Sequence, residues 1–303
     1  MPPLPLPPPA HDAPLPPARD AGDGVRVLAG VPYASLPGVR PLELDLYLPG
    51  EGPAPVVVFV HGGGWRLGSR HTLGPAYAGR RPAPFEEVAR AGIAVASVDH
   101  RLSGEARWPA QLHDVKAAVR WLRTRAGELG IDPDRVLAWG ESAGGHLAAL
   151  LGLTGDRPDL EGDVGVAGPS SAVTAVAAWY APSDLPALAA DAGADPLAAD
   201  SREAQLLGAP VPTVPERAAE ASPVTHVDPG APPFLLLHGQ VDRFVPFAQS
   251  ERLRDALQGV DADVALTAYD GADHLWLGSP AAADDALTRT IAFLAARSAA
   301  AGH

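Results

Sequence analysis

Cysteine is absent from this chain of 303 residues. Its absence excludes disulfide bonds and thiolate metal sites, although an oxidising compartment does not oblige a protein to contain cysteine. The paired histidine and carboxylate spacing of zinc proteases is absent as well. We therefore expect no bound metal and no other cofactor.

Lysine and long apolar runs are scarce. Only one of the 23 basic residues is a lysine, Lys116, and the formal net charge is −13. An acidic chain without a basic patch is disfavoured at a phosphate backbone, so we expect no nucleic-acid partner. No stretch approaches eighteen uninterrupted apolar residues, the length of a membrane helix, so we also expect no membrane span.

The first residues are rich in proline. Residues 1–17 hold nine of the 34 prolines and neither lysine nor arginine. They lack the charged start and apolar core of a signal peptide, which favours a cytoplasmic location. We interpret residues 1–22 as an extended, polyproline-like arm. Two roles stay open for this arm: a disordered or surface-draped leader, or a segment that docks in an aromatic groove.

A G-x-S-x-G motif lies between two apolar runs. Arg135–Trp139 predicts a strand and His146–Leu151 predicts a helix, with Gly140-Glu141-Ser142-Ala143-Gly144 between them. The two glycines remove Cβ atoms where strand and helix approach, so Ser142 can occupy a strained turn with its hydroxyl exposed. The amino end of the helix also favours developing negative charge. The alternative is a glycine-rich turn with an incidental serine, since three fixed positions recur by chance.

A glycine triplet follows another predicted strand upstream. Pro55–Val60 is an apolar, β-branched run typical of a buried parallel strand, and it leads directly into His61-Gly62-Gly63-Gly64-Trp65. Such glycines let backbone N–H groups point into a cavity, as stabilising an oxyanion requires. The alternative is a flexible loop. Two motifs of this kind, each at the end of a buried strand, favour a reactive site.

Two later strand ends supply candidates for proton transfer, in the chain order Ser, Asp, His. Phe234–His238 predicts a strand with Asp242 on the loop beyond it, and Val264–Tyr269 predicts another that is followed by His274. Loops at the carboxyl ends of strands converge on one crevice in α/β sheets. We therefore predict His274 as the base and Asp242 as its acid. Asp184 is the competing acid, in a loop after the apolar run Val173–Tyr180.

The chain as a whole favours one α/β domain. It is 47% hydrophobic, and predicted strands alternate with helical segments. One helical face is formed by apolar residues three and four apart: Leu112, Val115, Val119, Leu122, Ala126 and Leu129. Leu287, Ile291 and Leu294 predict a terminal helix packed on the sheet. Residues 183–232 form a long connection that we interpret as a lid or a wall of the acyl pocket.

Four motifs together resemble the α/β-hydrolases of the hormone-sensitive-lipase group and of the acetyl-xylan and feruloyl esterase-like (BD-FAE-like) carboxylesterase group. The motifs are His61–Trp65, Gly140–His146, His238–Asp242 and Gly271–His274. The similarity covers roughly residues 25 to 298. One departure is His100, where relatives commonly carry tyrosine before an Arg-Leu pair.

The resemblance implies an α/β-hydrolase fold, with a mostly parallel central sheet flanked by helices, and a catalytic domain over residues 23–300. It implies a serine hydrolase that cleaves carboxylic esters of short to medium acyl chain through an acyl-enzyme intermediate. Ser142 would attack the ester, His274 would take and return its proton, and Asp242 would hold the imidazole in the useful tautomer.

The resemblance also implies how the oxyanion is bound. Backbone N–H groups of Gly63, Gly64 and Ala143 would donate to it. Trp65 either lines the acyl pocket or supplies its N–H in place of a glycine, and Glu141 is interpreted as a structural carboxylate beside the nucleophile, at the edge of the substrate pocket.

The partner implied is a small-molecule ester, and the sequence leaves the oligomeric state open. Acetylated or feruloylated sugars are alternative substrates, as is the amide of an arylformamidase. The alternative of another class is a ligand-binding receptor that keeps the fold without turnover. A missing base would favour that receptor, and His274 is present.

Overall fold

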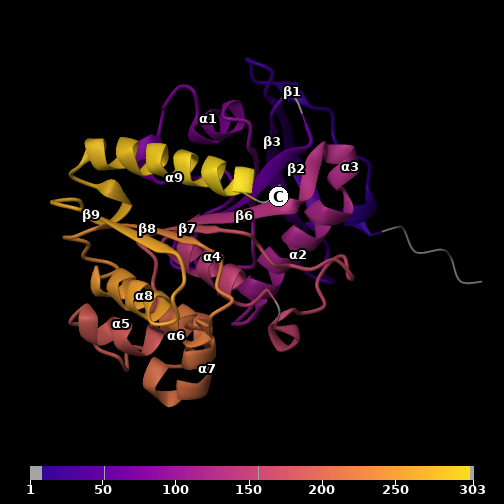
Figure 1. Ribbon diagram of the computed structural model, residues 1–303. Coiled ribbons are helices and arrows are strands. Elements are labelled where there is room, and N and C mark those ends of the chain that lie inside the picture. The colour runs from indigo at the N-terminus through magenta and orange to yellow at the C-terminus, as the bar shows by residue number, and fades with distance from the viewer. Residues whose placement is uncertain (1–8, 51, 156, 301–303) are drawn as a thin grey trace, which may run out of the picture.

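A mostly parallel sheet runs through the molecule in this computed structural model, which describes residues 9–50, 52–155 and 157–300. Within these residues the strands form one sheet in the order β1-β2-β3-β5-β4-β6-β7-β8-β9 (Figure 1). Pairing is parallel from β5 through β4 to β9 and antiparallel among β1, β2, β3 and β5. The strands are β1 Arg19–Asp20, β2 Arg26–Ala34, β3 Leu42–Leu48, β4 Ala54–Val60, β5 Ala94–Val98, β6 Ile131–Glu141, β7 Val176–Trp179, β8 Phe234–Gly239 and β9 Val264–Tyr269.

The central strands are apolar throughout because both faces of the sheet are covered. Every residue of β4 and of β8 is buried, whereas β9 at the sheet's edge is partly exposed. Successive residues of β4 enter different cores: Val56, Val58 and Val60 pack on one side, Val57 and Phe59 on the other. The strands predicted from the sequence are present.

Helices form a layer on each face of the sheet (Figure 1). Residues of α1 and α9 belong to one core, and residues of α2, α4 and α8 to the other. The helices are α1 Pro84–Arg90, α2 Ala110–Thr124, α3 Ala126–Leu129, α4 Ala143–Leu153, α5 Leu185–Asp191, α6 Arg202–Leu207, α7 Pro215–Glu220, α8 Ala248–Gln258 and α9 Pro280–Ala300. None of the helices in the described ranges has the length and hydropathy needed to cross a membrane.

Short 3₁₀ helices lie in the connections: η1 Ala10–Asp12, η2 Pro75–Tyr77, η3 Pro158–Leu160, η4 Val211–Thr213, η5 Pro223–His226 and η6 His274–Trp276.

The apolar face predicted over residues 112–129 is buried, but it belongs to two helices. Helix α2 ends at Thr124, and Arg125, with φ −100° and ψ 10°, separates it from α3. The terminal helix is confirmed as α9, in which Leu287 and Leu294 are buried.

The connection 183–232 joins β7 to β8, as predicted, and much of it is helical. It holds α5, α6, α7, η4 and η5. Figure 1 shows α5 to α7 clustered beyond α8, at one end of the molecule. Leu185 and Leu206 of this connection belong to the same core as the buried residues of α4 and α8.

The described part of the proline-rich arm lies on the domain. The indole Nε1 of Trp121 donates to the carbonyl of His11 at 2.9 Å, and Arg125 donates to the carbonyl of Ala13 at 3.3 Å. Arg19 and Asp20 then pair with β2. Within residues 9–22 the arm is therefore surface-draped, with one 3₁₀ turn, while its prediction for residues 1–8 lies outside the described residues.

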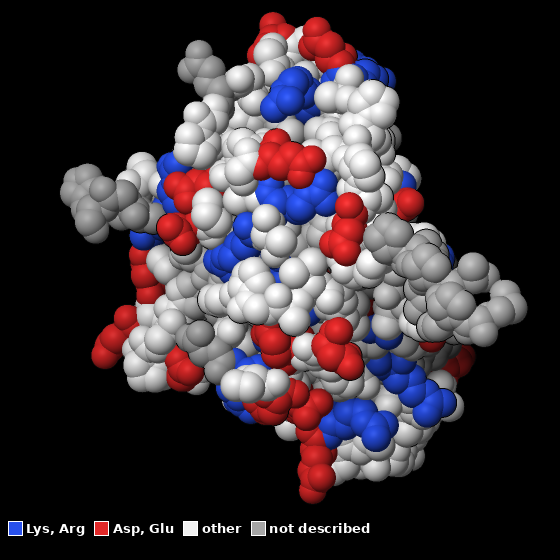
Figure 2. All heavy atoms as spheres, turned by 90° about the vertical axis from the view of Figure 1, so that its right-hand side faces the viewer, with Lys and Arg blue, Asp and Glu red and all other residues white. Residues whose placement is uncertain are grey.

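The single lysine is enclosed between helices. Lys116 of α2 has no exposed side-chain surface, and its Nζ donates to the carbonyl of Thr154 at 2.5 Å and to Glu161 at 3.2 Å. Burial lowers the pKa of this amine, and Glu161 partly opposes that effect. On the molecular face in Figure 2 basic and acidic side chains are interspersed, so that face carries no extended basic field.

Candidate active site

Ser142 lies in a strained turn between β6 and α4. Its φ of 53° and ψ of −122° are sparsely populated by residues other than glycine. Its N–H donates to the carbonyl of Trp179 at 2.9 Å, and its own carbonyl accepts from His146 at 3.0 Å. The neighbouring strand and helix therefore hold this conformation.

The flanking glycines are required by close packing. A Cβ atom at Gly140 would overlap the carbonyl of Gly144, and one at Gly144 would overlap the carbonyls of Val60 and His61. Gly140 therefore serves the approach of β6 and α4, as predicted, whereas Gly144 serves the approach of α4 to the end of β4.

Three predicted side chains form one hydrogen-bonded row. The Nε2 atom of His274 lies 3.0 Å from Ser142 Oγ, and its Nδ1 lies 2.6 Å from Asp242 Oδ2. All three residues are buried, at 4% exposure for Ser142, 8% for Asp242 and 5% for His274. They meet because β6, β8 and β9 are parallel and end at the same edge of the sheet.

Asp242 accepts hydrogen bonds on both oxygens. Backbone N–H groups of Phe244 and Val245 donate to Oδ1, each at 2.8 Å. The Nε2 atom of His238 lies 3.4 Å from Oδ2. Burial raises the pKa of Asp242, but hydrogen bonds from His238 and His274 outweigh burial and hold this pKa well below its ordinary value. The carboxylate is therefore charged at neutral pH.

His238 also contacts Asp242, a role that was not predicted from the sequence. Its Nε2 lies 2.9 Å from the carbonyl of Val245 and its Nδ1 lies 2.7 Å from Ser250 Oγ, so the ring is fixed against Asp242. The only signal in the sequence was its position four residues before Asp242.

The competing acid lies elsewhere. Asp184 is the N-cap of α5, where its side chain accepts from the N–H of Ala187 at 3.3 Å and faces Arg252 at 3.6 Å. His274 Nδ1 contacts Asp242 instead. The alternative that Asp184 orients the base is therefore wrong.

The glycine loop borders the same cavity. Gly63 and Gly64 have φ of 117° and 60°, and both line the cavity together with Ser142 and His274. Ala143 is the first residue of α4, so its N–H has no acceptor within the helix. These positions are compatible with oxyanion binding, whose donors stay a prediction.

Trp65, one of the two residues predicted for the substrate pocket, is buried. It has a φ of 57°, its side chain is 1% exposed, and its Nε1 donates to His146 at 3.2 Å. The ring therefore lies in the core and lines none of the three cavities described below, while a role for the Trp65 N–H in oxyanion binding stays a prediction.

Glu141, which precedes Ser142 in the chain, is buried. It accepts from the hydroxyl of Tyr180 at 2.7 Å and from the N–H of Gly74 at 3.2 Å. Burial raises its pKa, and these donors partly oppose the effect. The ring of Tyr180 lies 4.7 Å from that of His274, so Glu141, by holding the Tyr180 hydroxyl, helps to fix the ring that packs on His274.

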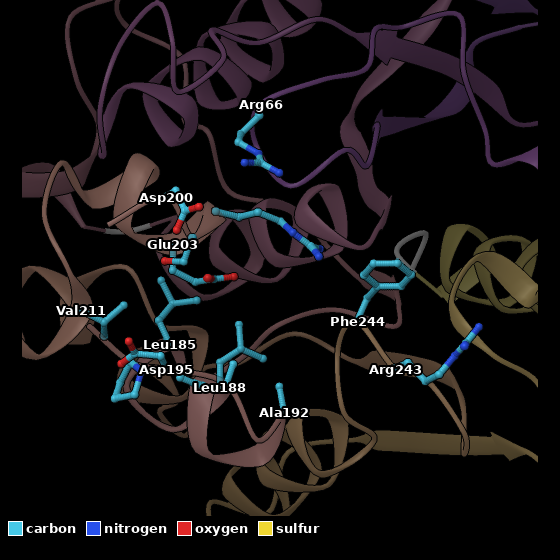
Figure 3. A pocket seen from close by; sticks show the side chains of 15 residues that line it. Arg66, Leu185, Leu188, Ala192, Asp195, Asp200, Glu203, Val211, Arg243 and Phe244 are labelled. Atoms are coloured by element: carbon cyan, nitrogen blue, oxygen red, sulfur yellow. The ribbon is translucent and has the colours of Figure 1, made fainter. Parts of the chain in front are cut away.

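Three adjoining cavities meet near Ser142. The cavity at the hydroxyl has a volume of about 290 Å³ and is bordered by Leu67, Phe244 and Leu275 in addition to the residues above. A cleft of about 570 Å³ adjoins it at Gly63 and Leu275 and has Glu141 in its wall. A third cavity of about 300 Å³ lies against α5, and Leu185 and Leu188 form part of its wall (Figure 3). No group of three potential metal ligands occurs within the described residues.

Known proteins resemble this chain in sequence. The model of the BD-FAE family matches residues 44–257. Esterase LipC of Mycobacterium tuberculosis is 34% identical over 223 residues, which is 73% of this chain and 53% of the relative. Esterase LipQ of the same organism is 33% identical over 247 residues, 79% of this chain and 54% of the relative. The chain thus spans about half the length of these curated relatives.

Two solved structures resemble this chain, and the similarity extends over nearly the whole length of each of them. A structure described as a truncated form of carbohydrate esterase from gut microbiota has a TM-score of 0.79 at 30% identity, covering 92% of this chain and 99% of that one. Esterase Est2 of Thermogutta terrifontis, with propionate bound, has a TM-score of 0.70 at 28% identity, covering 90% and 94%.

Proposed function

The chain belongs to the BD-FAE family of α/β-hydrolases, and on that basis we propose that it hydrolyses carboxylic esters of short to medium acyl chain. The observation that carries the proposal is the position of His274, whose Nε2 lies 3.0 Å from Ser142 Oγ while Nδ1 contacts Asp242. A base within hydrogen-bond distance of a serine hydroxyl, itself oriented by a carboxylate, is the arrangement that activates serine as a nucleophile.

Acylation begins with the serine hydroxyl. His274 accepts the proton of Ser142 as Oγ attacks the ester carbonyl, and Asp242 stabilises the imidazolium that forms. The N–H groups of Gly63, Gly64 and Ala143 donate to the tetrahedral oxyanion, where each lost donor costs on the order of a hundredfold in rate. His274 then returns the proton to the leaving alcohol.

Deacylation repeats these steps with water. His274 takes a proton from the attacking water, the C–O bond to Ser142 breaks, and the proton returns to Oγ. One water is consumed, and one acid and one alcohol are released. No cofactor takes part in these steps.

The first test is turnover of 4-nitrophenyl acetate and butyrate. The Ser142→Ala variant should lose nearly all activity while its circular dichroism and melting temperature stay close to those of the parent, because only the attacking oxygen is removed. Full activity in this variant would refute the assignment.

Carbohydrate esters are a second candidate. The support is the similarity to the gut carbohydrate esterase, which extends over 99% of that chain. Acetylated xylan and methyl ferulate, with N-formylkynurenine as an amide, would rank these substrates against simple esters. The receptor alternative predicts stoichiometric binding without turnover, and the hydrogen bond between His274 and Ser142 favours hydrolysis instead.

We assign residues 23–300 to the catalytic domain and the connection 183–232 to the wall of its substrate site. The support is that Arg202 borders the cavity at Ser142, while Leu185 and Val211 border the cavity beside it. Pocket walls select acyl and alcohol groups.

A further inference from the structure

Two arginines stand where the cavity at Ser142 meets the cavity against α5. Arg66, Arg202 and Phe244 line both cavities, so they mark the junction between them. In Figure 3, Arg66 reaches into the cavity from above, Phe244 borders one side, and Leu185 and Leu188 lie below. A substrate group that extends from the serine toward α5 passes these guanidinium groups.

Neither guanidinium is held in an ion pair by the described residues, although three carboxylates line the same cavity. Among the described residues, no carboxylate lies within ion-pair distance of Arg66 or Arg202. Arg66 donates to the amide oxygen of Gln205 at 3.4 Å, and the guanidinium of Arg202 lies over the ring of Phe244, 5.0 Å from its centroid. Arg243, which borders the same cavity, is by contrast paired with Asp273 at 2.5 Å.

Local structure holds both arginines in place. Arg202 is the first residue of α6, which is capped by Ser201 through a 3.1 Å hydrogen bond to the N–H of Ala204. Its stem packs on the glycine loop, because a Cβ at Gly64 would lie 2.5 Å from Arg202 Cδ. Gln205, three residues along the same helix, holds Arg66. Both side chains are half-buried, and two cations held at one junction favour a bound anion.

We infer that Arg66 and Arg202 form a carboxylate-binding subsite, and that the preferred substrates are esters whose acyl or alcohol part carries a carboxylate. The inference rests on the proposed hydrolysis and specifies its substrate class. Guanidinium groups bind carboxylates through paired N–H···O hydrogen bonds.

The acidic residues of the cavity define where the anion binds. Asp195, Asp200 and Glu203 border the cavity on the side away from Phe244 (Figure 3). They repel an anion there, so the carboxylate is held at the junction, in the cavity that Arg66 and Arg202 line together with Ser142.

The test compares charged and neutral esters of matched length. Mono-4-nitrophenyl adipate against 4-nitrophenyl hexanoate places the carboxylate on the acyl side. The pair 4-acetoxybenzoate and methyl 4-acetoxybenzoate places it on the alcohol side. The charged-to-neutral ratio of kcat/KM should exceed one in at least one pair for the parent. In Arg66→Gln and Arg202→Gln it should fall at least about tenfold, as expected for a lost charge-assisted hydrogen bond.

Controls separate this subsite from general charge effects. Arg202→Lys should retain part of the preference, and high salt should weaken it. Arg289→Gln removes the same charge from α9, where Arg289 is 52% exposed and paired with Asp285, and should leave the ratio unchanged. An unchanged ratio in both Arg66→Gln and Arg202→Gln would overturn the inference.

A binding measurement separates failure of the subsite from failure of the proposed function. Calorimetry on Ser142→Ala should show tighter binding of the adipate monoester than of the hexanoate ester, by at least about tenfold, and adding Arg202→Gln should remove the difference. Equal affinities would overturn the subsite while turnover of neutral esters still supported hydrolysis. A preference for adipate in Ser142→Ala, without turnover of any ester by the parent, would contradict hydrolysis and support the subsite.

Discussion

Asp242 receives more donors than orienting an imidazole alone would require. Two backbone N–H groups serve Oδ1, while His238 and His274 approach Oδ2. The carboxylate therefore stays ionised and cannot rotate away from His274. Replacing it by an amide keeps the shape and presents an N–H or a weaker acceptor to the ring, which favours the wrong tautomer.

We predict that Asp242→Asn lowers kcat for 4-nitrophenyl butyrate by about 10⁴-fold, as the loss of a triad carboxylate does. Asp184→Asn is the matched control, because Asp184 caps α5 and does not touch His274. Its kcat should stay within about threefold of the parent, and its stability within about 1 kcal/mol. Equal losses in the two variants would contradict the assignment of the acid.

The burial of two histidines, His100 and His146, makes the free energy of unfolding depend on pH below about 6.5. Burial lowers the pKa of His100 to about 3 and that of His146 to about 4. Both are neutral in the folded protein, whereas the unfolded chain binds their protons below a pH of about 6.5. The unfolded state therefore gains protons as the pH falls, and the free energy of unfolding should decrease from about pH 6.5 to about pH 4.

The variant His100→Phe binds no proton at this position in either state. Between pH 6.5 and 4 its free energy of unfolding should fall less steeply than that of the parent, by up to about 1.4 kcal/mol per pH unit. Urea unfolding across pH 4 to 8 measures the two slopes, and the range above pH 7 serves as the internal control. Parallel curves down to pH 4 would contradict the prediction.

The meeting of Ser142, Asp242 and His274 at one edge of the sheet was predictable, because each residue follows an apolar run typical of a strand. Side-chain direction was not predictable. Trp65 has a φ of 57° and its ring is buried in the core, and no neighbouring residue in the sequence indicates that conformation. The arginine pair was also missed, because it joins a loop after β4 to a helix 136 residues later in the chain.

At the scale of elements, the parallel strands β4, β6, β7 and β8 were the clearest to predict, since burial on both faces leaves an uninterrupted apolar run. The parallel strand β5 was not predicted, although all of its residues are buried. The antiparallel strand β2 was not predicted. It contains Gly30 and Pro32, and its register with β3 shifts between Leu28 and Val31. Helix continuity was overestimated at Arg125, because the apolar spacing persists across the break between α2 and α3.

The start of α4 packs closely against the end of β4 and the first residue of the glycine loop. We predict that Gly144→Ala destabilises the protein by about 3 kcal/mol or more and removes most esterase turnover, because the added methyl overlaps the carbonyls of Val60 and His61. Gly127→Ala is the control: it lies in α3 with no atom within 4 Å of the added Cβ, and should stabilise by up to about 1 kcal/mol. Thermal unfolding of both variants measures the contrast. A Gly144→Ala protein as stable as the Gly127→Ala protein would contradict it.

At the scale of the whole molecule, the sheet separates two cores, and the proline-rich arm adds a small contact outside them. Residues 10–13 cover the end of α2, where Trp121 is 1% exposed. The indole and the guanidinium of Arg125 both donate to arm carbonyls. The arm is therefore part of the folded surface near α2, and the cavity at Ser142 includes none of its described residues.

Deleting residues 1–14 should lower the melting temperature by about 2 to 4 °C, equivalent to about 1 kcal/mol, because two donors lose their acceptors and an indole becomes exposed. The fluorescence of Trp121 should shift to longer wavelength, while kcat for 4-nitrophenyl butyrate stays the same. An unaltered melting temperature and emission spectrum would show that the contact contributes nothing in solution.

The enclosed position of Lys116 has a practical consequence. Amine-directed reagents such as N-hydroxysuccinimide esters and glutaraldehyde meet no accessible side-chain amine on the native surface, since this chain has only one lysine and its side chain has no exposed area. Acylation of that lysine requires the structure around its Nζ, where Thr154 and Glu161 lie, to open, so its time course, followed by mass spectrometry, measures the rate of that opening.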